Sequence, residues 1–232
     1  MPKLLILNME VKFEDVIRSA APSLEVVLVE AEIDNPQTSD ALWNRIEETA
    51  ALIREKYKME EIRHRPAIAG TRDAYKALGK EPNRYRPSAE ALCRRAVKGM
   101  ELYRTLTVID LINLVSMLTG HSIGGFDADK IAGDTITLGS GRPGEPYEAI
   151  GRGELNIENL PVFRDSVGGI GTPTSDNDRT KLSPETHRLL MTVNIYRTSD
   201  GYDTDDVEKL IRDLLAEFAS LRSIKFKRYK AE

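Results

Sequence analysis

The sequence of 232 residues predicts an α+β protein built as a single domain, residues 1–232. Before Gly120, apolar residues recur mostly at helical spacing. After Gly120, glycine and proline become frequent and short β-like runs replace the helical pattern. Hydrophobic residues make up 41% of the chain, enough for a sizeable core, and no repeat or linker divides it.

The first half is predicted to contain two strands and five helices. Runs of Leu, Ile and Val indicate the strands, and Ser39 and Gly79 are a plausible N-cap and a helix end. Thr107-Val-Ile-Asp110 resembles a capping box at the start of the last of these helices, which ends at Gly120. The predicted elements are strand 3–9, helix 12–20, strand 24–31, and helices at 38–57, 67–78, 87–97 and 107–120.

The second half is predicted to form an antiparallel sheet or sandwich joined by glycine-rich loops, followed by one helix. The strands are expected at 134–138, 147–150, 161–164 and 189–196. The helix starts near Asp203 and carries one apolar stripe that ends at Phe218. The basic tail from Arg222 to Lys230 is expected to fray.

Composition excludes several classes of protein. No apolar run approaches the roughly 18 residues that a membrane span needs, and the N-terminus is interpreted as a strand and not a signal peptide. Cys93 is the only cysteine, which excludes an intramolecular disulfide and suits the cytoplasm. The three histidines lie far apart with no ligand spacing, so we expect no metal, although distant carboxylates could still assemble a site. No cofactor is expected either.

Charge is unevenly distributed along the chain. Residues 63–98 carry ten Lys/Arg against three Asp/Glu, whereas residues 1–62 and 99–221 are both acidic. Such a basic block suggests a polyanionic partner, and Arg84, Arg86, Arg94 and Arg95 are its candidate phosphate contacts. The alternative is that these arginines cap helices and pair with acidic residues of the same chain.

The segment from Gly139 to Gly144 satisfies the G-x-G-x-x-G pattern of a dinucleotide site. Such a site needs a helix to begin there, and Pro143 and Pro146 prevent one. We therefore predict a hairpin loop. No phosphate-binding loop, H-E-x-x-H or G-x-S-x-G motif is present.

Asp110 and Asn113 are three residues apart, and hence on one face of an otherwise apolar helix. Polar groups buried there need partners. They form either a structural pair that bonds neighbouring loops or the floor of a pocket, where Asn113 would bind a ligand.

Two glycine-rich segments follow. In the predicted loop 121–133, Gly124 and Gly125 allow positive φ or a close approach, while Asp127 and Asp129 could hold a metal but more often cap. The segment 165–176 supplies hydroxyls and free amides, which suit hydrogen bonding to an amino acid, a sugar or a phosphate. It is otherwise an ordinary surface turn.

The stretch 107–133, TVIDLINLVSMLTGHSIGGFDADKIAG, resembles the B3/B4 domain of the phenylalanyl-tRNA synthetase β subunit. That family shows an Asp-x-x-Asn helix, a glycine- or proline-containing loop, Phe-Asp, and Asp-x-Ile-x-Gly, and its glycine loop is matched by Gly168-Gly169-Ile. The resemblance spans about residues 62–196. With 1–61 and 203–232 as flanking parts of the same domain, nearly the whole chain resembles free-standing members of the family.

The resemblance implies a three-layer α+β fold with a β-sandwich of mainly antiparallel strands flanked by helices. In the synthetase this domain hydrolyses misacylated tRNA, removing tyrosine from the phenylalanine tRNA. Its pocket asparagine corresponds to Asn113. Its histidine position is Gly124 here and its glutamate falls near Thr174, so tyrosine specificity is not carried over.

The predicted function is therefore the hydrolysis in trans of a mischarged aminoacyl-tRNA. The alternative is a non-catalytic module that binds an amino acid, a small metabolite or a partner protein. Asn113 and His121 are the candidate catalytic residues, with His121 standing in for the family's histidine. The candidate substrate-binding residues are Asp110, Gly124, Gly125, Gly168, Gly169, Gly171, Thr172, Thr174 and Ser175.

Overall fold

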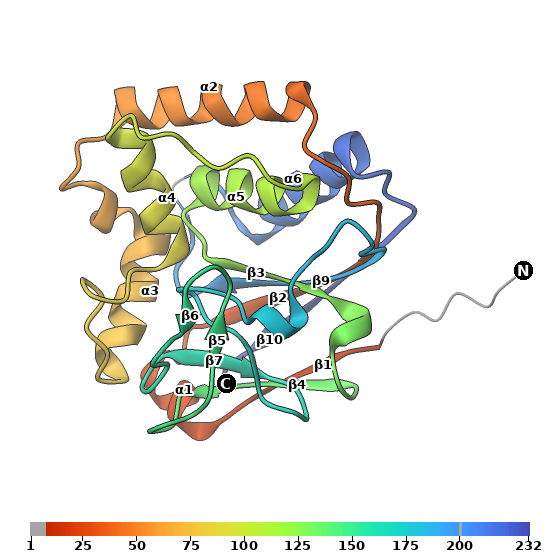
Figure 1. Ribbon diagram of the computed structural model, residues 1–232. Coiled ribbons are helices and arrows are strands. Elements are labelled where there is room, and N and C mark those ends of the chain that lie inside the picture. Colours follow the sequence, from red (N-terminus) through yellow and green to blue (C-terminus); the bar gives the residue numbers. More distant parts are fainter. Residues whose placement is uncertain (1–7, 200) are drawn as a thin grey trace, which may run out of the picture.

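The computed structural model describes residues 8–199 and 201–232. These residues form three layers, in which helices cover one face of a sheet and a second sheet packs against its other face (Figure 1). The α+β fold with a β-sandwich flanked by helices is thereby confirmed. The helices are α1 (Asp15–Ala20), α2 (Asp40–Lys56), α3 (Pro66–Ala77), α4 (Ser88–Val97), α5 (Thr107–Thr119) and α6 (Thr204–Phe218), with 3₁₀ turns at Ile62–His64, Ala128–Lys130 and Asp178–Thr180.

The central sheet has the order β10-β2-β9-β3 and is antiparallel throughout, whereas in the outer sheet, β1-β4-β7-β8, the pair β1 and β4 is parallel. A small third sheet pairs β5 with β6. The strands are β1 (Glu10–Phe13), β2 (Glu25–Glu32), β3 (Ile123–Asp127), β4 (Thr135–Ser140), β5 (Glu148–Ala149), β6 (Gly153–Glu154), β7 (Pro161–Arg164), β8 (Gly169–Gly171), β9 (Arg188–Ile195) and β10 (Ser223–Lys230).

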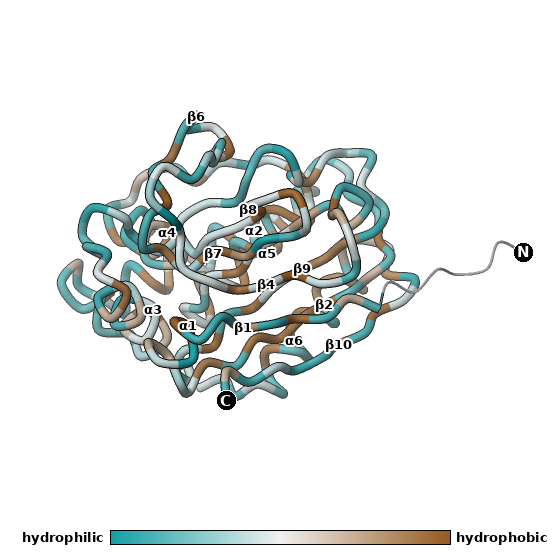
Figure 2. The backbone as a smooth tube through the Cα atoms, turned by 90° about the horizontal axis from the view of Figure 1, so that it is seen from below, coloured by the Kyte–Doolittle hydropathy of each residue, from teal (hydrophilic) through white to brown (hydrophobic). Residues whose placement is uncertain are grey.

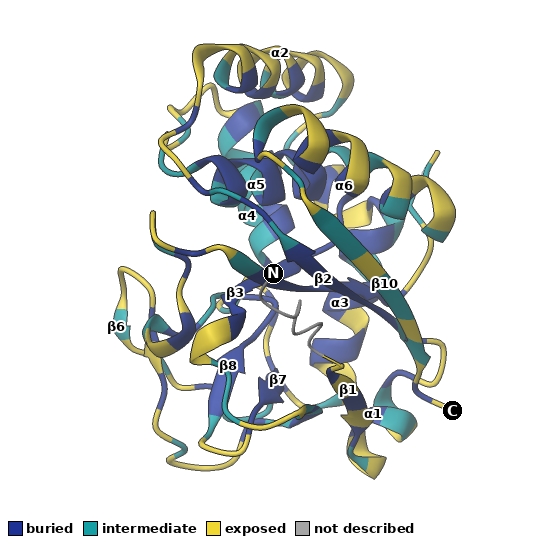
Figure 3. Ribbon diagram, turned by 90° about the vertical axis from the view of Figure 1, so that its right-hand side faces the viewer, coloured by how far each residue is buried: buried dark blue, intermediate teal, exposed yellow. Residues whose placement is uncertain are grey.

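Strand β2 shows why the central sheet is buried on both faces. Val27 and Val29 join the core beneath the helices, while the alternating Val26 and Leu28 join the core between the two sheets. All four are fully buried. The hydrophobic segments of β2, β9 and β4 accordingly run through the middle of the molecule (Figure 2), and the exposed surface of the helical layer is the outer face of α2 and α6 (Figure 3).

Helix α5 lies within the helical layer and carries the candidate residues Asp110 and Asn113. It ends at Gly120, whose φ of +80° is the left-handed conformation that glycine adopts most readily. The buried Arg65 guanidinium donates to the carbonyls of Met117 and Leu118, both at 2.8 Å, which satisfies the end of the helix. The predicted capping box is wrong, because Leu106 is the N-cap residue and its side chain makes no capping hydrogen bond. Asn35 Oδ1 instead accepts from the Val108 amide in the first turn at 2.9 Å.

Three segments predicted to be irregular contain strands, the third being the glycine-rich segment 165–176 with β8. The predicted loop 121–133 contains β3, which is fully buried and pairs with β9. The basic tail is not frayed, because it forms β10 and pairs with β2 along eight residues. Its Ile224 and Phe226 pack on the helical layer and Arg228 pairs with Asp205 and Glu208 of α6, while the lysines occupy a sheet edge, where they discourage pairing with another chain.

The remaining predicted boundaries agree with the structure to within a few residues. The exceptions lie at the N-terminus. Of the strand predicted at 3–9, residues 3–7 lie outside the described residues, and the first described strand is β1. The helix predicted at 12–20 begins only at Asp15, because Lys12 and Phe13 belong to β1.

Candidate functional site

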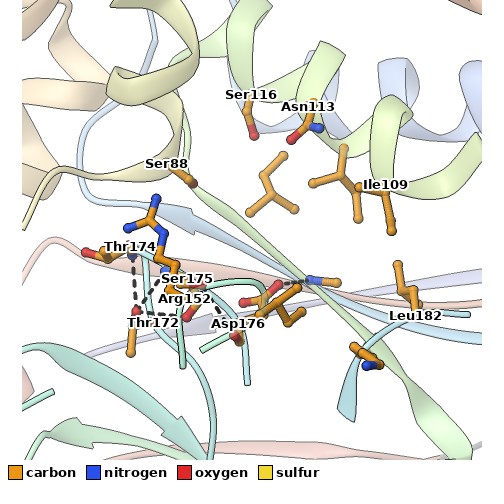
Figure 4. A pocket seen from close by; sticks show the side chains of 15 residues that line it. Ser88, Ile109, Asn113, Ser116, Arg152, Thr172, Thr174, Ser175, Asp176 and Leu182 are labelled. Carbon is orange, nitrogen blue, oxygen red and sulfur yellow. Dashed lines mark hydrogen bonds between the residues drawn. The ribbon is translucent and has the colours of Figure 1, made fainter. Parts of the chain in front are cut away.

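A pocket of about 320 Å³ lies between α5 and the segment 172–176, with β3 beneath it (Figure 4). This volume is at the lower end of the range for small-molecule sites. Five aliphatic side chains make up its apolar part: Ile109, Ile112, Ile123, Ile150 and Leu182. The polar part and the single glycine of the lining are Ser88, Asn113, Ser116, Gly125, Arg152, Thr172, Thr174, Ser175, Asp176 and Lys181.

Asp110 and Asn113 lie one turn apart on α5 and have opposite environments. The Asp110 carboxylate is fully buried and accepts hydrogen bonds from the Thr105 amide and hydroxyl, both at 2.8 Å, and from the Thr38 hydroxyl. Asp110 does not line the pocket. The Asn113 side chain points into it and makes no hydrogen bond with any part of the chain that the structure describes (Figure 4). The structural interpretation therefore fits Asp110, and the pocket interpretation fits Asn113.

Gly125 allows α5 and β3 to approach closely. Its φ is not positive, but a Cβ atom at this position would overlap Cδ1 of Ile112 on the facing helix. A side chain here would displace the Ile112 side chain and change the pocket. Of the two predicted properties of this glycine, the close approach is the one that the structure uses.

The hydroxyl-rich segment opposite α5 is held by its own hydrogen bonds. The Thr172 hydroxyl donates to the Ser175 carbonyl at 3.0 Å and accepts from the amides of Thr174 and Ser175 at 3.2 and 3.1 Å. The Thr174 hydroxyl is 2.9 Å from the hydroxyl of the buried Tyr75. Thr172, Thr174 and Ser175 thus line the pocket as predicted, on a turn of fixed shape.

Asp176 is the acidic residue of the pocket and was not singled out from the sequence. Its Oδ2 accepts a hydrogen bond from the Gly125 amide at 3.1 Å, and no ion pair with it exists among the described residues. Burial raises the pKa of Asp176 to about 7, although the Gly125 hydrogen bond acts to lower it. A carboxylate that changes charge near neutral pH can accept a proton or pair with a cation from a ligand.

Two further polar residues of the pocket were missed by the sequence analysis. Ser116 lies three residues after Asn113 on the same helical face, so helical spacing could have identified it. Arg152 lies in the exposed turn between β5 and β6, and nothing in its local sequence marks it. Its guanidinium makes no hydrogen bond or ion pair with residues 8–199 or 201–232.

His121 and Gly124 do not line the pocket. His121 is fully buried, and desolvation lowers its pKa to about 4, so it is neutral at physiological pH. Its position gives it no access to a ligand in this pocket. Gly124 faces the other side of β3, where a Cβ atom would come within 2.8 Å of Phe126 and Thr192.

The glycines of the 165–176 segment also stand apart from the pocket. The Gly168 amide donates to Asp165 at 3.1 Å, and Gly169 and Gly171 belong to β8, which pairs with β7. None of the three lines the pocket. The expected supply of glycine amides is thus already used within the fold.

The basic block 63–98 is partly structural. Arg65, Arg72 and Lys80 are buried, and Arg72 forms an ion pair of 2.8 Å with the buried Glu90. Arg94 pairs with Glu90 at 3.6 Å, as the pairing interpretation predicts, and donates to the Met59 carbonyl at 3.3 Å, whereas Arg95 donates to the Glu101 carbonyl at 2.6 Å.

Arg84 and Arg86 are exposed and lie in the segment that leads to Ser88 of the pocket. Of the four candidate arginines, only these two are exposed, and they lie close in sequence to a residue of the pocket.

Other predicted features have structural roles. Asp127 accepts from the Asp129 amide at 3.1 Å and caps the 3₁₀ turn, so capping and not metal binding describes it. Within residues 8–199 and 201–232, no group of three or more His, Cys, Asp or Glu side chains could hold a metal ion. No helix follows the Gly139–Gly144 motif, as predicted, and no helix in the described part of the chain could cross a membrane.

Comparison with known proteins gives the family. The B3/4 domain model matches residues 70–214, a range that includes every residue lining the pocket. This chain belongs to the B3/4 domain family. Membership confirms the resemblance on which the sequence analysis relied.

Two other comparisons place this B3/4 domain among known proteins. No curated protein matches it. Among solved structures it is similar to an N-terminal fragment of the phenylalanyl-tRNA synthetase β-subunit from Pyrococcus horikoshii, with 16% identity and a TM-score of 0.46. The match covers 97% of this chain and 53% of that one, so the chain spans about half of the fragment's length.

Proposed function

We propose that this B3/4 domain hydrolyses the ester bond of a mischarged aminoacyl-tRNA in trans. The observation that supports this most is the Asn113 amide, which has no partner among the described residues and points into the pocket. The family resemblance assigns an asparagine at this helical position to the editing pocket. A volume of about 320 Å³ suits an aminoacyl group, with the tRNA left outside.

In the proposed reaction, a water oxygen attacks the carbonyl carbon of the ester. The bond between that carbon and the ribose oxygen breaks, and the tRNA hydroxyl leaves with one proton of the water. Asn113 donates to the carbonyl oxygen as negative charge develops there, which is the type of interaction that contributes most in acyl transfer. Since the glycine amides are occupied, the Ser88 and Ser116 hydroxyls, which make no hydrogen bond with the described residues, are further candidate donors in the lining.

The tRNA would approach from the side of Arg152. This guanidinium, which has no partner among the described residues, can meet a phosphate near the 3′ end, and the exposed Arg84 and Arg86 extend the positive surface. Arg94 and Arg95 remain candidates for the same surface, although each already donates to a carbonyl of the chain. The activity would belong in the cytoplasm, where tRNAs are charged.

A deacylation panel tests the proposal. Each tRNA, charged with a cognate or near-cognate amino acid, is incubated with the wild type, with Asn113→Ala, and with Asn156→Ala, which changes an exposed asparagine outside the pocket. We expect release above the spontaneous rate from one or a few tRNAs, reduced about 100-fold by Asn113→Ala only. Spontaneous rates throughout the panel, from folded protein, would reject hydrolysis.

One observation favours a second function, the binding of an amino acid without catalysis. None of the described residues that line the pocket is a histidine, so the pocket lacks the side chain that most often acts as a general base. A thermal-shift screen with free amino acids separates the two functions, because a ligand at 100 times its Kd stabilises a protein by about 2.7 kcal/mol. Stabilisation by an amino acid, together with intact charged tRNAs, would favour the binding module.

A further inference from the structure

We propose that Asp176 is the counter-ion for a primary ammonium group of the ligand, and that the ligand's aliphatic side chain packs against the isoleucines of α5. This inference rests on the proposed function, because the ammonium would be the free α-amino group of the aminoacyl ester. It assigns the substrate class of the pocket: an unblocked amino acid with an aliphatic side chain.

The hydrogen bonds of Asp176 leave one oxygen free for a ligand. Oδ2 accepts from the Gly125 amide at 3.1 Å, whereas Oδ1 accepts no hydrogen bond from the described residues. The carboxylate lies on the wall opposite Asn113 and Ser116 (Figure 4). A ligand between these walls can therefore reach the Asp176 carboxylate and the Asn113 amide from its two sides.

The charged and titratable groups around Asp176 do not neutralise it. Lys181 lines the same pocket but pairs with Asp178 at 2.8 Å, and Arg152 forms no ion pair with Asp176. Tyr147 lies near, with its hydroxyl donating to the Ser175 carbonyl at 2.7 Å. A desolvated carboxylate without a cation is costly, and a ligand that brings the cation removes that cost. The raised pKa of Asp176 has the same cause.

The rest of the lining determines what accompanies the ammonium group. None of the described residues that line the pocket is aromatic, so they offer no aromatic cage for cation recognition. Ile109 and Ile112 of α5, with Ile123 and Leu182, form an aliphatic surface instead. Burying an aliphatic side chain against these four residues is favourable. A tyrosine side chain in the same place would bury its hydroxyl against side chains that cannot form a hydrogen bond with it.

Calorimetry with non-hydrolysable probes tests the inference. The probes are adenosines that carry glycyl, valyl, leucyl or tyrosyl groups on a 3′-amide, and the N-acetyl derivative of each. We expect the valyl or leucyl probe to bind most tightly and acetylation to weaken its binding at least 10-fold. Equal affinity for the free and acetylated probes, tighter binding of the tyrosyl probe, or no binding of any probe would overturn the inference.

Two variants show whether Asp176 is responsible. Asp176→Asn should bind the free and acetylated probes equally, whereas Asp213→Asn, which removes one exposed carboxylate from α6, should discriminate as the wild type does. Discrimination that survives in folded Asp176→Asn would overturn the assignment. Amine-dependent binding without deacylation of any tRNA would reject hydrolysis alone, and deacylation without amine dependence would reject this inference alone.

Discussion

The glycine-rich segment 165–176 begins and ends with an aspartate, and the two carboxylates have opposite environments. Asp165 accepts from the amides of Ala132, Val167 and Gly168, and its ion pair with Arg179 has an N–O distance of 2.8 Å. Burial alone would raise the pKa of Asp165, but Arg179 and these amides lower it below its usual value. Asp176 has one amide donor and no cation among the described residues, and its pKa is raised to about 7.

The difference separates a structural carboxylate from a candidate binding group. Where the chain needs a carboxylate to hold a loop, it supplies every partner, as it does for Asp165. Where it leaves a partner out inside a pocket, a ligand can take that place. Asp110 and Asn113 on α5 repeat the contrast, because the first is fully hydrogen-bonded and the second faces the pocket unpaired.

The largest expected effect is a loss of stability on substitution of Asp165, the structural carboxylate. Asp165→Asn keeps the shape of the side chain but leaves Arg179 without its charged partner, in a loop that three amide hydrogen bonds hold. We expect the free energy of unfolding to fall by about 3 kcal/mol, measured by urea denaturation at pH 7. A loss below about 0.5 kcal/mol would show that the loop does not depend on this carboxylate.

The next largest effect on stability is expected at Asp110, in contrast to Asn113 on the same helix. Asp110→Ala leaves the buried hydroxyl of Thr38 and the Thr105 amide without their acceptor, and we expect it to cost about 2 kcal/mol. Asn113→Ala should change stability by no more than about 0.5 kcal/mol, because it removes no internal hydrogen bond. The same denaturation experiment measures both. Equal losses would mean that Asn113 is structural, like Asp110.

Asp176→Asn should change stability in the opposite direction from Asp165→Asn, and only at higher pH. Below about pH 4 the Asp176 carboxyl is protonated in both the folded and the unfolded wild type, so the substitution does not change the free energy of unfolding. Between pH 4 and 7 the unfolded chain releases the proton first, which lowers the stability of the wild type. Above pH 7 we expect the variant to be more stable by about 1 kcal/mol or more.

Urea denaturation of the wild type and of Asp176→Asn at pH 4, 6 and 8 measures this difference in the free energy of unfolding. A variant less stable than the wild type at pH 8 would show that Asp176 has a stabilising partner, and would place it with Asp165.

The smallest expected effect is at the edge of the pocket. Arg152→Ala should weaken tRNA binding by a few fold and reduce the slope of log affinity against log salt by about 1, as for the loss of one phosphate contact. Lys209→Ala, on the exposed face of α6, is the matched control and should change neither. Filter binding at several salt concentrations checks both, and an unchanged slope for Arg152→Ala would remove this residue from the tRNA surface.

Sequence periodicity was sufficient for the helices and for most strands, because each buries a regular apolar pattern. It failed for β10, β3 and β8, and for the end of β1. The lysines and arginines of β10 suggested a frayed tail, but Ile224 and Phe226 pack on the helical layer and the cations stay at the sheet edge. Gly124 and Gly125 suggested a loop, whereas β3 is a strand that needs glycines because a helix and side chains approach it closely.

Within the candidate site, spacing identified what lies on α5 but not what lies opposite. Asn113 follows from the helical face and from the family resemblance. Asp165 and Asp176 cannot be told apart by sequence, since both flank the same glycine-rich segment, and only the tertiary position of Arg179 and Gly125 distinguishes them. His121 is close in sequence to the position of the family's histidine, but it lies between α5 and β3, where it is buried in the core and outside the pocket.

The most direct test of this contrast is a titration of the aspartate side chains by carbon-13 NMR, with Asp176→Asn used for assignment. We expect one carboxyl, absent from the spectrum of the variant, to titrate with a midpoint near pH 7, and the midpoint of Asp165 to lie below the usual value of 3.8. Saturation with the free valyl or leucyl probe should move the Asp176 midpoint down, because an ammonium partner favours the carboxylate. A midpoint for Asp176 near 4 in the ligand-free protein would contradict the account, since the carboxylate would then already be stabilised by the chain or by water.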